Sequence, residues 1–542
     1  MNRSTLILGT GVLALTWVVA AWDTPLKTLW PVIVALTLVV ITRRAFWGLL
    51  IGAFAGSVIL CNGNPWQAYL ELLSRHLAPS LSSSWKMGAI LFTLVLGGFA
   101  AVLHEGTGFQ TMLHLFVGKR TNAARRFQAA AAGLGIICFF DGLANSMLVG
   151  RVGKDMAEKC GVSRVKLAYI VDSTSSAVAC VAFVSTWIAY QLSMIKEGFR
   201  MAGRDVNPYL IFVKSIPYNF YCWFTLVMLF VSIFRRFNPG PMHRFENEAR
   251  ALNTPMAEAP TLFAGKGAGV HSVLIPLITL ISLFFLGFYV LGTTGPKWPV
   301  TAEKIARAFG SNAGPLVLVL SSLIATCIAI LLFPSRKDGY LLQGVLAFKE
   351  GVQSLMGPIF ILVAAWIIGS VLGELKTAEY FSSVMSRTDA AVLIPSLIFI
   401  TGSLISFSTG TSWGTMGILF PLAIPIAATA CRAGDPAWQE TYLQISVAAV
   451  FSGAVFGDHC SPFSDTTIIS SISCDVEPHD HIRTQIPFAL ITAVITVFFG
   501  FLPAGLGLPS LVLLSAGALF LMFLPTLLHR FNSSLSARRE FE

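Results

Sequence analysis

Four aspartates interrupt apolar stretches of this 542-residue chain: Asp141, Asp172, Asp458 and Asp465. A carboxylate at the centre of a membrane-spanning helix costs about 2.5–3.5 kcal/mol on insertion scales, so such residues usually mark an ion or substrate path. Hard cations prefer oxygen ligands from carboxylates, hydroxyls and main-chain carbonyls. We therefore predict that Asp172, Asp458 and Asp465 bind Na⁺, with a proton competing for the same carboxylates.

Asp172 opens a polar run, in which Ser173, Thr174 and Ser175 follow directly. Ser and Thr hydroxyls compete for main-chain hydrogen bonds, so this run is expected to unwind the helix and add ligands. A packing contact between helices, where Ser and Thr are common, is the alternative interpretation.

Asp458 and Asp465 flank a second polar run, "GDHCSPFSDTT" (457–467). Pro462 removes a main-chain donor and predicts a helix break between the two carboxylates. His459 is a candidate proton carrier, with a structural role as the alternative. The hydroxyls expected to join this site are those of Ser461, Ser464 and Thr466. The cluster His479, Asp480 and His481 is expected to form a solvated loop, with a pH-sensing or metal site as the alternative.

Two further apolar stretches carry polar interruptions and predict re-entrant hairpins at 127–150 and 390–430. At the first tip, Asn145 and Ser146 are expected to cap the returning half-helix. Asp141, at the same tip, is expected to bind the ion or substrate, with a role only as an N-cap as the alternative. The second tip suits a helix break with exposed N–H groups, and its candidate residues are Ser408, Thr409, Gly410, Thr411, Ser412 and Trp413. Trp413 either seals the site or packs as an ordinary aromatic.

The composition explains what must position these residues. The chain is 55% hydrophobic and 12% charged, whereas a soluble domain carries about 25% charged residues. This excludes an ordinary water-soluble enzyme and a disordered or fibrous chain. Twelve apolar stretches approach the length of about 20 residues that a spanning helix needs. We expect an all-α polytopic membrane protein with about 12 transmembrane helices plus the two hairpins.

Two halves of the chain resemble each other. "KMG" (86–88) and "LMG" (355–357) each open a span that leads to a hairpin and then to a span with a polar run. An odd number of crossings separates equivalent spans, which predicts inverted repeats. The expected organisation is an N-terminal peripheral helix (1–28), repeat 1 (29–234, with hairpin 127–150 and broken helix 167–192), a cytoplasmic linker (235–270), repeat 2 (271–504, with hairpin 390–430 and broken helix 443–472), and a C-terminal helix and tail (505–542).

The net charge of +10 is attributed to cytoplasmic loops and not to nucleic acid binding. More basic residues fall in the loops that share a side with the two termini, so both termini are expected in the cytoplasm. We therefore expect a multi-pass protein of the inner membrane that is surrounded by membrane lipids.

The motifs also resemble a known family. The strings "AAWIIGSVLGELKTAEY" (364–380), "FSTGTSWGTMGILFPLAIPIA" (407–427), "GDHCSPFSDTTIISS" (457–471) and "HDHIRTQIPFAL" (479–490) look like those of NhaC-family Na⁺/H⁺ antiporters. The resemblance implies inverted repeats, paired hairpins and an elevator mechanism, with the site among the hairpin tips and broken spans. Elevator mechanics also predict a homodimer.

The main functional hypothesis is Na⁺/H⁺ antiport, with both ions as cargo and no cofactor. The alternative keeps the fold and transports or exchanges a small organic acid or amino acid, coupled to Na⁺ or H⁺. The tips "ANS" (144–146) and "TGTS" (409–412) favour this alternative, although no intramembrane arginine is expected to clamp the anion. An enzyme is not expected, because no nucleophile elbow surrounds Ser464, His459 and Asp465.

Overall fold

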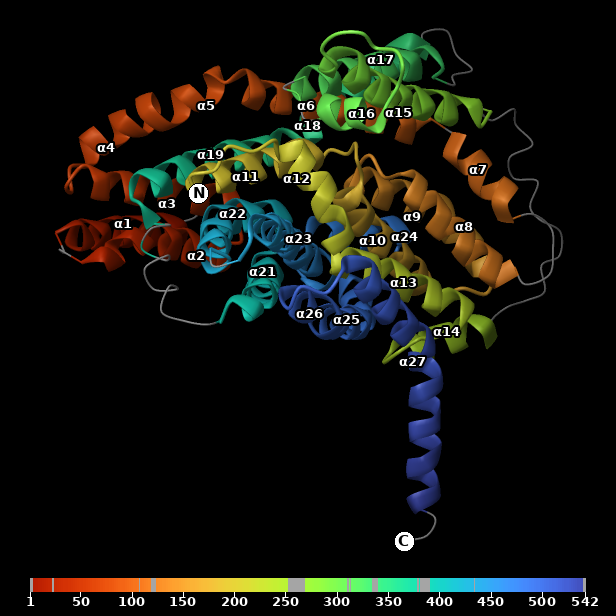
Figure 1. The fold of residues 1–542 in the computed structure, drawn as a ribbon. Coiled ribbons are helices and arrows are strands. Elements are labelled where there is room, and N and C mark those ends of the chain that lie inside the picture. Colours follow the sequence, from red (N-terminus) through yellow and green to blue (C-terminus); the bar gives the residue numbers. More distant parts are fainter. Residues whose placement is uncertain are drawn as a thin grey trace.

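The computed structural model describes residues 3–21, 24–106, 108–117, 123–251, 269–309, 311, 313–333, 340–377, 380, 390–432 and 434–539. These residues form helices and connecting turns, without a strand among them (Figure 1). Ten helices are long and apolar enough to cross a membrane, or up to twelve if each of two bent pairs counts as one span. This confirms the prediction of an all-α polytopic membrane protein. Residues 252–268 of the predicted linker lie outside the described ranges.

Two groups of helices surround a central layer. The N-terminal group contains α1 (Arg3–Ala20), α2 (Trp30–Thr42) and α3 (Ala45–Leu60), which contact one another. The second group forms a layer at the top of Figure 1 and contains α6 (Ser84–Glu105), α15 (His271–Gly292), α17 (Gly314–Leu331) and α18 (Tyr340–Ser354). Helix α19 (Met356–Glu374) connects both groups to the central layer, because it contacts α3 of the first group, α18 of the second group and α22 of the central layer.

The central layer contains two helical hairpins and two interrupted helices. The hairpins are α8 (Ala123–Ile137) with α9 (Gly142–Lys159), and α21 (Ile394–Thr409) with α22 (Ser412–Ala430). The interrupted helices are α10 (Arg164–Val181) with α11 (Ile188–Met201), and α23 (Pro436–Cys460) with α24 (Asp465–Cys474). The contacts are reciprocal, because α9 packs on α10 and α24, whereas α22 packs on α23 and α11.

The first interrupted helix corrects one prediction. The polar run from Asp172 to Ser176 does not unwind, because α10 continues to Val181 and the interruption lies at 182–187. The hydroxyls find partners within a regular helix: Thr174 Oγ1 donates to the carbonyls of Ile170 and Val171 at 3.0 and 3.1 Å. Ser175 Oγ donates to the carbonyl of Gly142 at 2.7 Å, so this run joins α10 to the first hairpin.

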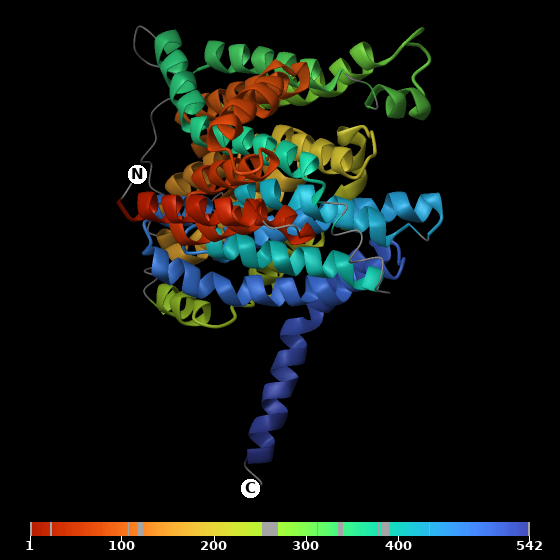
Figure 2. The same ribbon diagram turned by 90° about the vertical axis from the view of Figure 1, so that its left-hand side faces the viewer.

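The remaining elements complete the body. They are η1 (Pro25–Leu29), α4 (Pro65–Glu71), η2 (Leu72–Leu77), α5 (Ala78–Ser82), α7 (Gly108–Val117), α12 (Pro208–Ser215), η3 (Ile216–Tyr218), α13 (Phe220–Phe234), α14 (Met242–Ala251), α16 (Ala302–Phe309), η4 (Ala390–Leu393), α25 (Pro478–Ile495), η5 (Thr496–Phe501), α26 (Leu502–Gly505) and α27 (Ser510–Arg539). Helix α27 packs on α13 and η5, and its C-terminal part projects away from the rest of the molecule (Figures 1 and 2).

Candidate functional site

A cavity of about 410 Å³ lies where the two hairpin tips approach the break in the second interrupted helix. Three of the four predicted aspartates line it: Asp141, Asp458 and Asp465. The predicted residues Thr409, Gly410, Thr411, Ser412, Trp413, Ser464 and Thr466 line it as well. The structure therefore brings together the tips of both hairpins and the two sides of the break between α23 and α24.

Both tips present the N-terminus of a returning helix to this cavity. Asp141 caps α9 by accepting a hydrogen bond from the Ala144 amide at 2.6 Å. Thr411 caps α22 by accepting one from the Gly414 amide at 3.1 Å. Asp141 is thus an N-cap and a cavity-lining residue at once. Main-chain N–H groups at helix N-termini favour negative charge, so the tips can receive an anion or stabilise a nearby carboxylate.

The second tip closes tightly onto the helix break. Gly410 has φ of 65° and ends α21, a conformation that residues with a Cβ seldom adopt. A Cβ at this position would lie 2.5 Å from the main-chain carbonyl of Phe463. Ser461 Oγ adds a hydrogen bond to the carbonyl of Phe407 at 2.7 Å. The tip and the break at 461–464 are consequently one packed unit.

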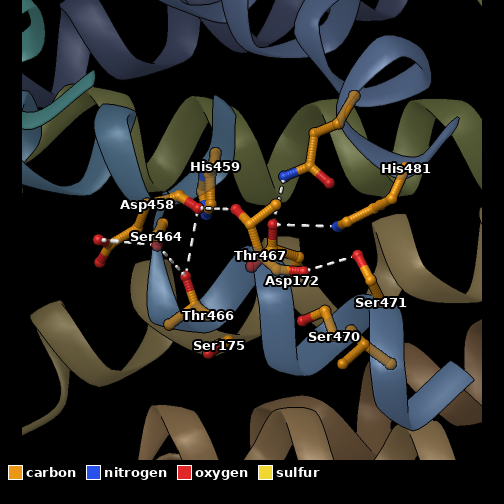
Figure 3. Close-up of polar contacts among 12 residues, drawn as sticks. Asp172, Ser175, Asp458, His459, Ser464, Thr466, Thr467, Ser470, Ser471 and His481 are labelled. Atoms are coloured by element: carbon orange, nitrogen blue, oxygen red, sulfur yellow. Dashed lines mark hydrogen bonds and ion pairs between the residues drawn. The ribbon is translucent and has the colours of Figure 1, made fainter. Parts of the chain in front are cut away.

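Asp458 has an incomplete set of partners. Its side chain is 3% exposed. Ser464 Oγ donates to Oδ1 at 3.4 Å, while Oδ2 has no hydrogen-bond partner among the residues that the structure describes. Thr466 and Thr467 hydroxyls donate to the main-chain carbonyl of Asp458 at 3.2 and 2.5 Å (Figure 3). Asp465, the first residue of α24, is exposed on the cavity. Buried oxygens without partners are costly, so Oδ2 is a candidate ligand atom for a cation or a proton.

Asp172 occupies a different place from the other three aspartates. It is fully buried and does not line the cavity. Gln485 Nε2 donates to Asp172 Oδ2 at 2.7 Å, and His481 Nε2 lies 3.4 Å from the same oxygen (Figure 3). Within the described ranges, no group of three or more His, Cys, Asp or Glu side chains could hold a metal ion. The three aspartates predicted to bind Na⁺ are therefore divided between two locations.

His481 also corrects a prediction. The sequence suggested a solvated loop at 479–481, but His481 is fully buried. Helix α25 begins at Pro478, which directs His481 and Gln485 to the same face because they are four residues apart. That face packs against α10, so both side chains reach Asp172.

Asn145 and Ser146 connect helices and do not cap α9. Asn145 Nδ2 donates to the carbonyls of Gly135 and Thr174 at 3.0 and 2.9 Å. Ser146 Oγ bonds with Ser470 Oγ at 3.1 Å, and Ser473 Oγ donates to the Ser146 carbonyl at 2.8 Å. The capping prediction is wrong because Asp141, at the true N-cap position, already fills that role.

Other predicted residues lie at the periphery of the cavity or away from it. His459 Nδ1 is 3.2 Å from the Tyr221 hydroxyl, between α23 and α13. Ser408 Oγ donates to the carbonyl of Leu404 within α21 and does not line the cavity, and Ser173 is buried in α10. Trp413 lines the cavity and packs on Tyr190, with ring centroids 4.5 Å apart; the Tyr190 hydroxyl donates to the Trp413 carbonyl.

Two arginines on the cavity were missed. Arg43 and Arg44 form the corner between α2 and α3, and the sequence interpretation treated them as loop charges. The Arg43 guanidinium lies 3.3 Å above the ring centroid of Phe463, in the helix break. Both arginines are also exposed, and the local sequence contains no signal that places them on the cavity, because their position depends on how α2 and α3 pack.

Comparisons with known proteins identify the family. The model of the Na⁺/H⁺ antiporter family matches residues 178–502, more than half of the chain. An uncharacterized protein of Haemophilus influenzae is 30% identical over 491 residues, covering 88% of this chain and 91% of its own. The malate-2H(+)/Na(+)-lactate antiporter of Bacillus subtilis is 32% identical over 196 residues, covering 35% of this chain and 38% of its own.

A solved structure supports the fold. The crystal structure of the YdaH transporter of Alcanivorax borkumensis has a TM-score of 0.56 and 14% identity, covering 80% of this chain and 90% of that chain. NhaC antiporters are also among the relatives, which confirms the resemblance that the motifs suggested. This membrane protein belongs to the Na⁺/H⁺ antiporter family.

Proposed function

We propose that the protein is a secondary active transporter of the inner membrane that exchanges Na⁺ for H⁺ at Asp458. The observation that carries this proposal is that Asp458 lines the cavity and that its buried Oδ2 has no hydrogen-bond partner among the described residues. Asp465 and Asp141 line the same cavity and add negative charge. The protein needs no catalytic chemistry for this role, and Na⁺ and H⁺ are its cargo.

Coupling follows from competition for one carboxylate. Na⁺ binds the ionised form of Asp458, and protonation removes that charge. Each ion therefore displaces the other from Asp458, and no additional coupling mechanism is needed. The Ser464 and Thr466 hydroxyls lie beside Asp458 and can complete an oxygen ligand set.

Alternating access would come from an elevator movement of two inverted repeats. The reciprocal contacts of the hairpins with the interrupted helices support this part of the proposal, because a twofold pseudo-axis would produce them. The hairpins and interrupted helices would move together, against a scaffold that includes α6, α15, α17 and α18. A homodimer would hold that scaffold in place. With both termini in the cytoplasm, the cavity edge at Arg43 and Arg44 would face the cytoplasm.

Everted membrane vesicles test the ion site. Addition of Na⁺ should release protons from vesicles with the native protein, and Asp458→Asn should abolish this release. Asp155→Asn is the matched control, since Asp155 is an exposed residue of α9 outside the cavity. Undiminished proton release by the Asp458→Asn variant would contradict the assignment.

A second candidate function is Na⁺- or H⁺-coupled transport of a small carboxylate or amino acid. Two features of the cavity favour it: the volume of about 410 Å³ exceeds the needs of a bare ion, and Arg43 and Arg44 line it together with the three aspartates. A bipolar cavity of this kind suits a solute with a carboxylate. The relative from Bacillus subtilis bears the name of a malate and lactate antiporter.

Proteoliposome uptake of labelled small acids separates the two candidates. If a carboxylate is cargo, Arg43→Gln should reduce its uptake at least about tenfold, as expected when a charge-assisted hydrogen bond is lost. Arg432→Gln, at an exposed position outside the cavity, should leave uptake unchanged. Absence of uptake for every acid and amino acid tested would restrict the function to Na⁺ and H⁺.

A further inference from the structure

A second cavity, of about 250 Å³, shares no lining residue with the cavity at the ion site. Its walls come from α8, the turn after α9, the end of α13 and helix α14. Three arginines line it, each from a different element: Arg125 from α8, Arg236 after α13, and Arg250 from α14. The wall also contains the polar side chains of Gln128, Ser232, Asn238 and Glu246.

The carboxylate on this wall already has other partners. Glu246 accepts hydrogen bonds from the Ser163 amide and hydroxyl at 2.9 and 2.8 Å. It also pairs with Arg250 at 3.6 Å. Within the part of the chain that the structure describes, no carboxylate lies within 4.0 Å of Arg125 or Arg236. Three arginines and one carboxylate therefore give this cavity a net positive charge, and the three arginines are exposed to solvent.

A buried lysine behind the wall adds to this imbalance. Lys166 is fully buried, and its Nζ donates to Asn238 Oδ1 at 2.8 Å. The ammonium also lies over the rings of Tyr169 and Phe488, at 5.0 and 5.2 Å from their centroids. Those contacts are with neutral groups, and the nearby carboxylate of Glu246 is shared with Ser163 and Arg250, so the charge of this buried cation is poorly compensated. Asn238 links Lys166 to the cavity, so an anion there would stabilise both.

We infer that this cavity binds a phosphate group, presented either by an anionic lipid or by free phosphate. Arginine forks match phosphate oxygens in pairs, which favours phosphate over a halide. Basic pockets between membrane helices are suited to anionic lipid head groups. The bound group would connect the first hairpin, through Arg125, to α13 and α14, through Arg236 and Arg250.

Thermal unfolding of the purified, delipidated full-length protein tests the site. Inorganic phosphate should raise the unfolding temperature more than chloride does at equal ionic strength. Vesicle-derived phosphatidylglycerol should do so more than phosphatidylcholine if a lipid is the source. The double variant Arg125→Gln/Arg236→Gln should weaken binding at least about tenfold, because each arginine contributes a charge-assisted contact. Arg244→Gln, on the same helix as Arg250 but outside the cavity, should change binding less than about twofold.

A second variant keeps the test decisive if the double variant fails to fold. Asn238→Asp supplies a carboxylate beside Lys166, so it should raise stability without ligand and abolish the effect of phosphate. Native mass spectrometry then identifies the source, because a retained lipid that phosphate displaces indicates a lipid site. The inference is overturned if chloride stabilises as well as phosphate, or if Asn238→Asp leaves phosphate and lipid binding unchanged.

Discussion

The aspartates of the two interrupted helices occupy opposite environments. Asp458 lines a cavity, whereas Asp172 is enclosed, accepts a hydrogen bond from Gln485 and lies 3.4 Å from His481. Each carboxylate has one oxygen, Oδ2 of Asp458 and Oδ1 of Asp172, without a hydrogen-bond partner among the described residues, so access to the cavity is what separates them. Figure 3 shows the two carboxylates on either side of Thr467. We refer to the residues around Asp458, Asp465 and Asp141 as the cavity cluster, and to Asp172, His481 and Gln485 as the sealed cluster.

A buried aspartate can serve either to exchange ions or to hold two helices together. A carboxylate that exchanges ions must reach water and must keep a ligand position open. A carboxylate whose partners come from a neighbouring helix instead joins that helix to its own. The same residue type in a similar sequence pattern thus supports transport in one place and packing in the other. Each of the following variants alters only one of the two clusters.

The largest effect is expected at the tip that closes the cavity cluster. Gly410→Ala forces a side chain into a left-handed conformation and places its Cβ 2.5 Å from the Phe463 carbonyl. We expect a loss of about 1–3 kcal/mol from backbone strain, together with loss of Na⁺-dependent proton release. Unfolding midpoints and vesicle assays measure the two effects.

Gly133→Ala is the control for that variant. A Cβ at Gly133 would meet nothing within 4 Å, and a helical Gly→Ala change usually stabilises by about 0.4–1 kcal/mol. Equal stability of the two variants would show that the tip tolerates rearrangement, against the close packing described above.

The sealed cluster should respond in stability more than in transport. His481→Leu removes one partner of buried Asp172, which should cost about 1–3 kcal/mol. The Na⁺ concentration for half-maximal activity should stay within about twofold, because the cavity cluster does not include His481. His479→Leu, at an exposed position of the same helix, is the matched control. A large change in Na⁺ dependence for His481→Leu would assign the sealed cluster to the ion path.

A smaller effect is expected within the cavity cluster at Asp465. This residue is exposed, so water already screens its charge. Asp465→Asn should raise the half-maximal Na⁺ concentration about tenfold or less, consistent with a charge interaction across a partly hydrated site. Concentration series in everted vesicles measure the change. Complete inactivation, equal to that of Asp458→Asn, would indicate that both carboxylates hold the ion directly.

The sequence predicted those features that depend on local chemistry. Apolar length identified the spans, Pro462 identified the second helix break, and polar interruptions identified the two hairpins. Asp458 and Asp465 were correctly placed on either side of that break.

Contacts between distant segments could not be predicted in this way. Asp172 and Gln485 are separated by 313 residues, so their pairing depends on how α25 packs against α10. The hydroxyls of Thr174 and Ser175 donate hydrogen bonds to carbonyls of α10 and of the first hairpin. The local sequence pattern did not predict these partners. Arg43 reaches the cavity because α2 and α3 pack beside the second tip, again a result of tertiary structure.

Proton release on Na⁺ binding, measured with purified protein and a pH indicator in weakly buffered detergent solution, tests directly whether Asp458 is the ion site. We expect that Asp458→Asn releases no protons when Na⁺ is added, whereas Asp172→Asn releases as many per protein as the native chain. Retained release by Asp458→Asn, with loss of release by Asp172→Asn, would contradict the assignment of the ion site to the cavity cluster.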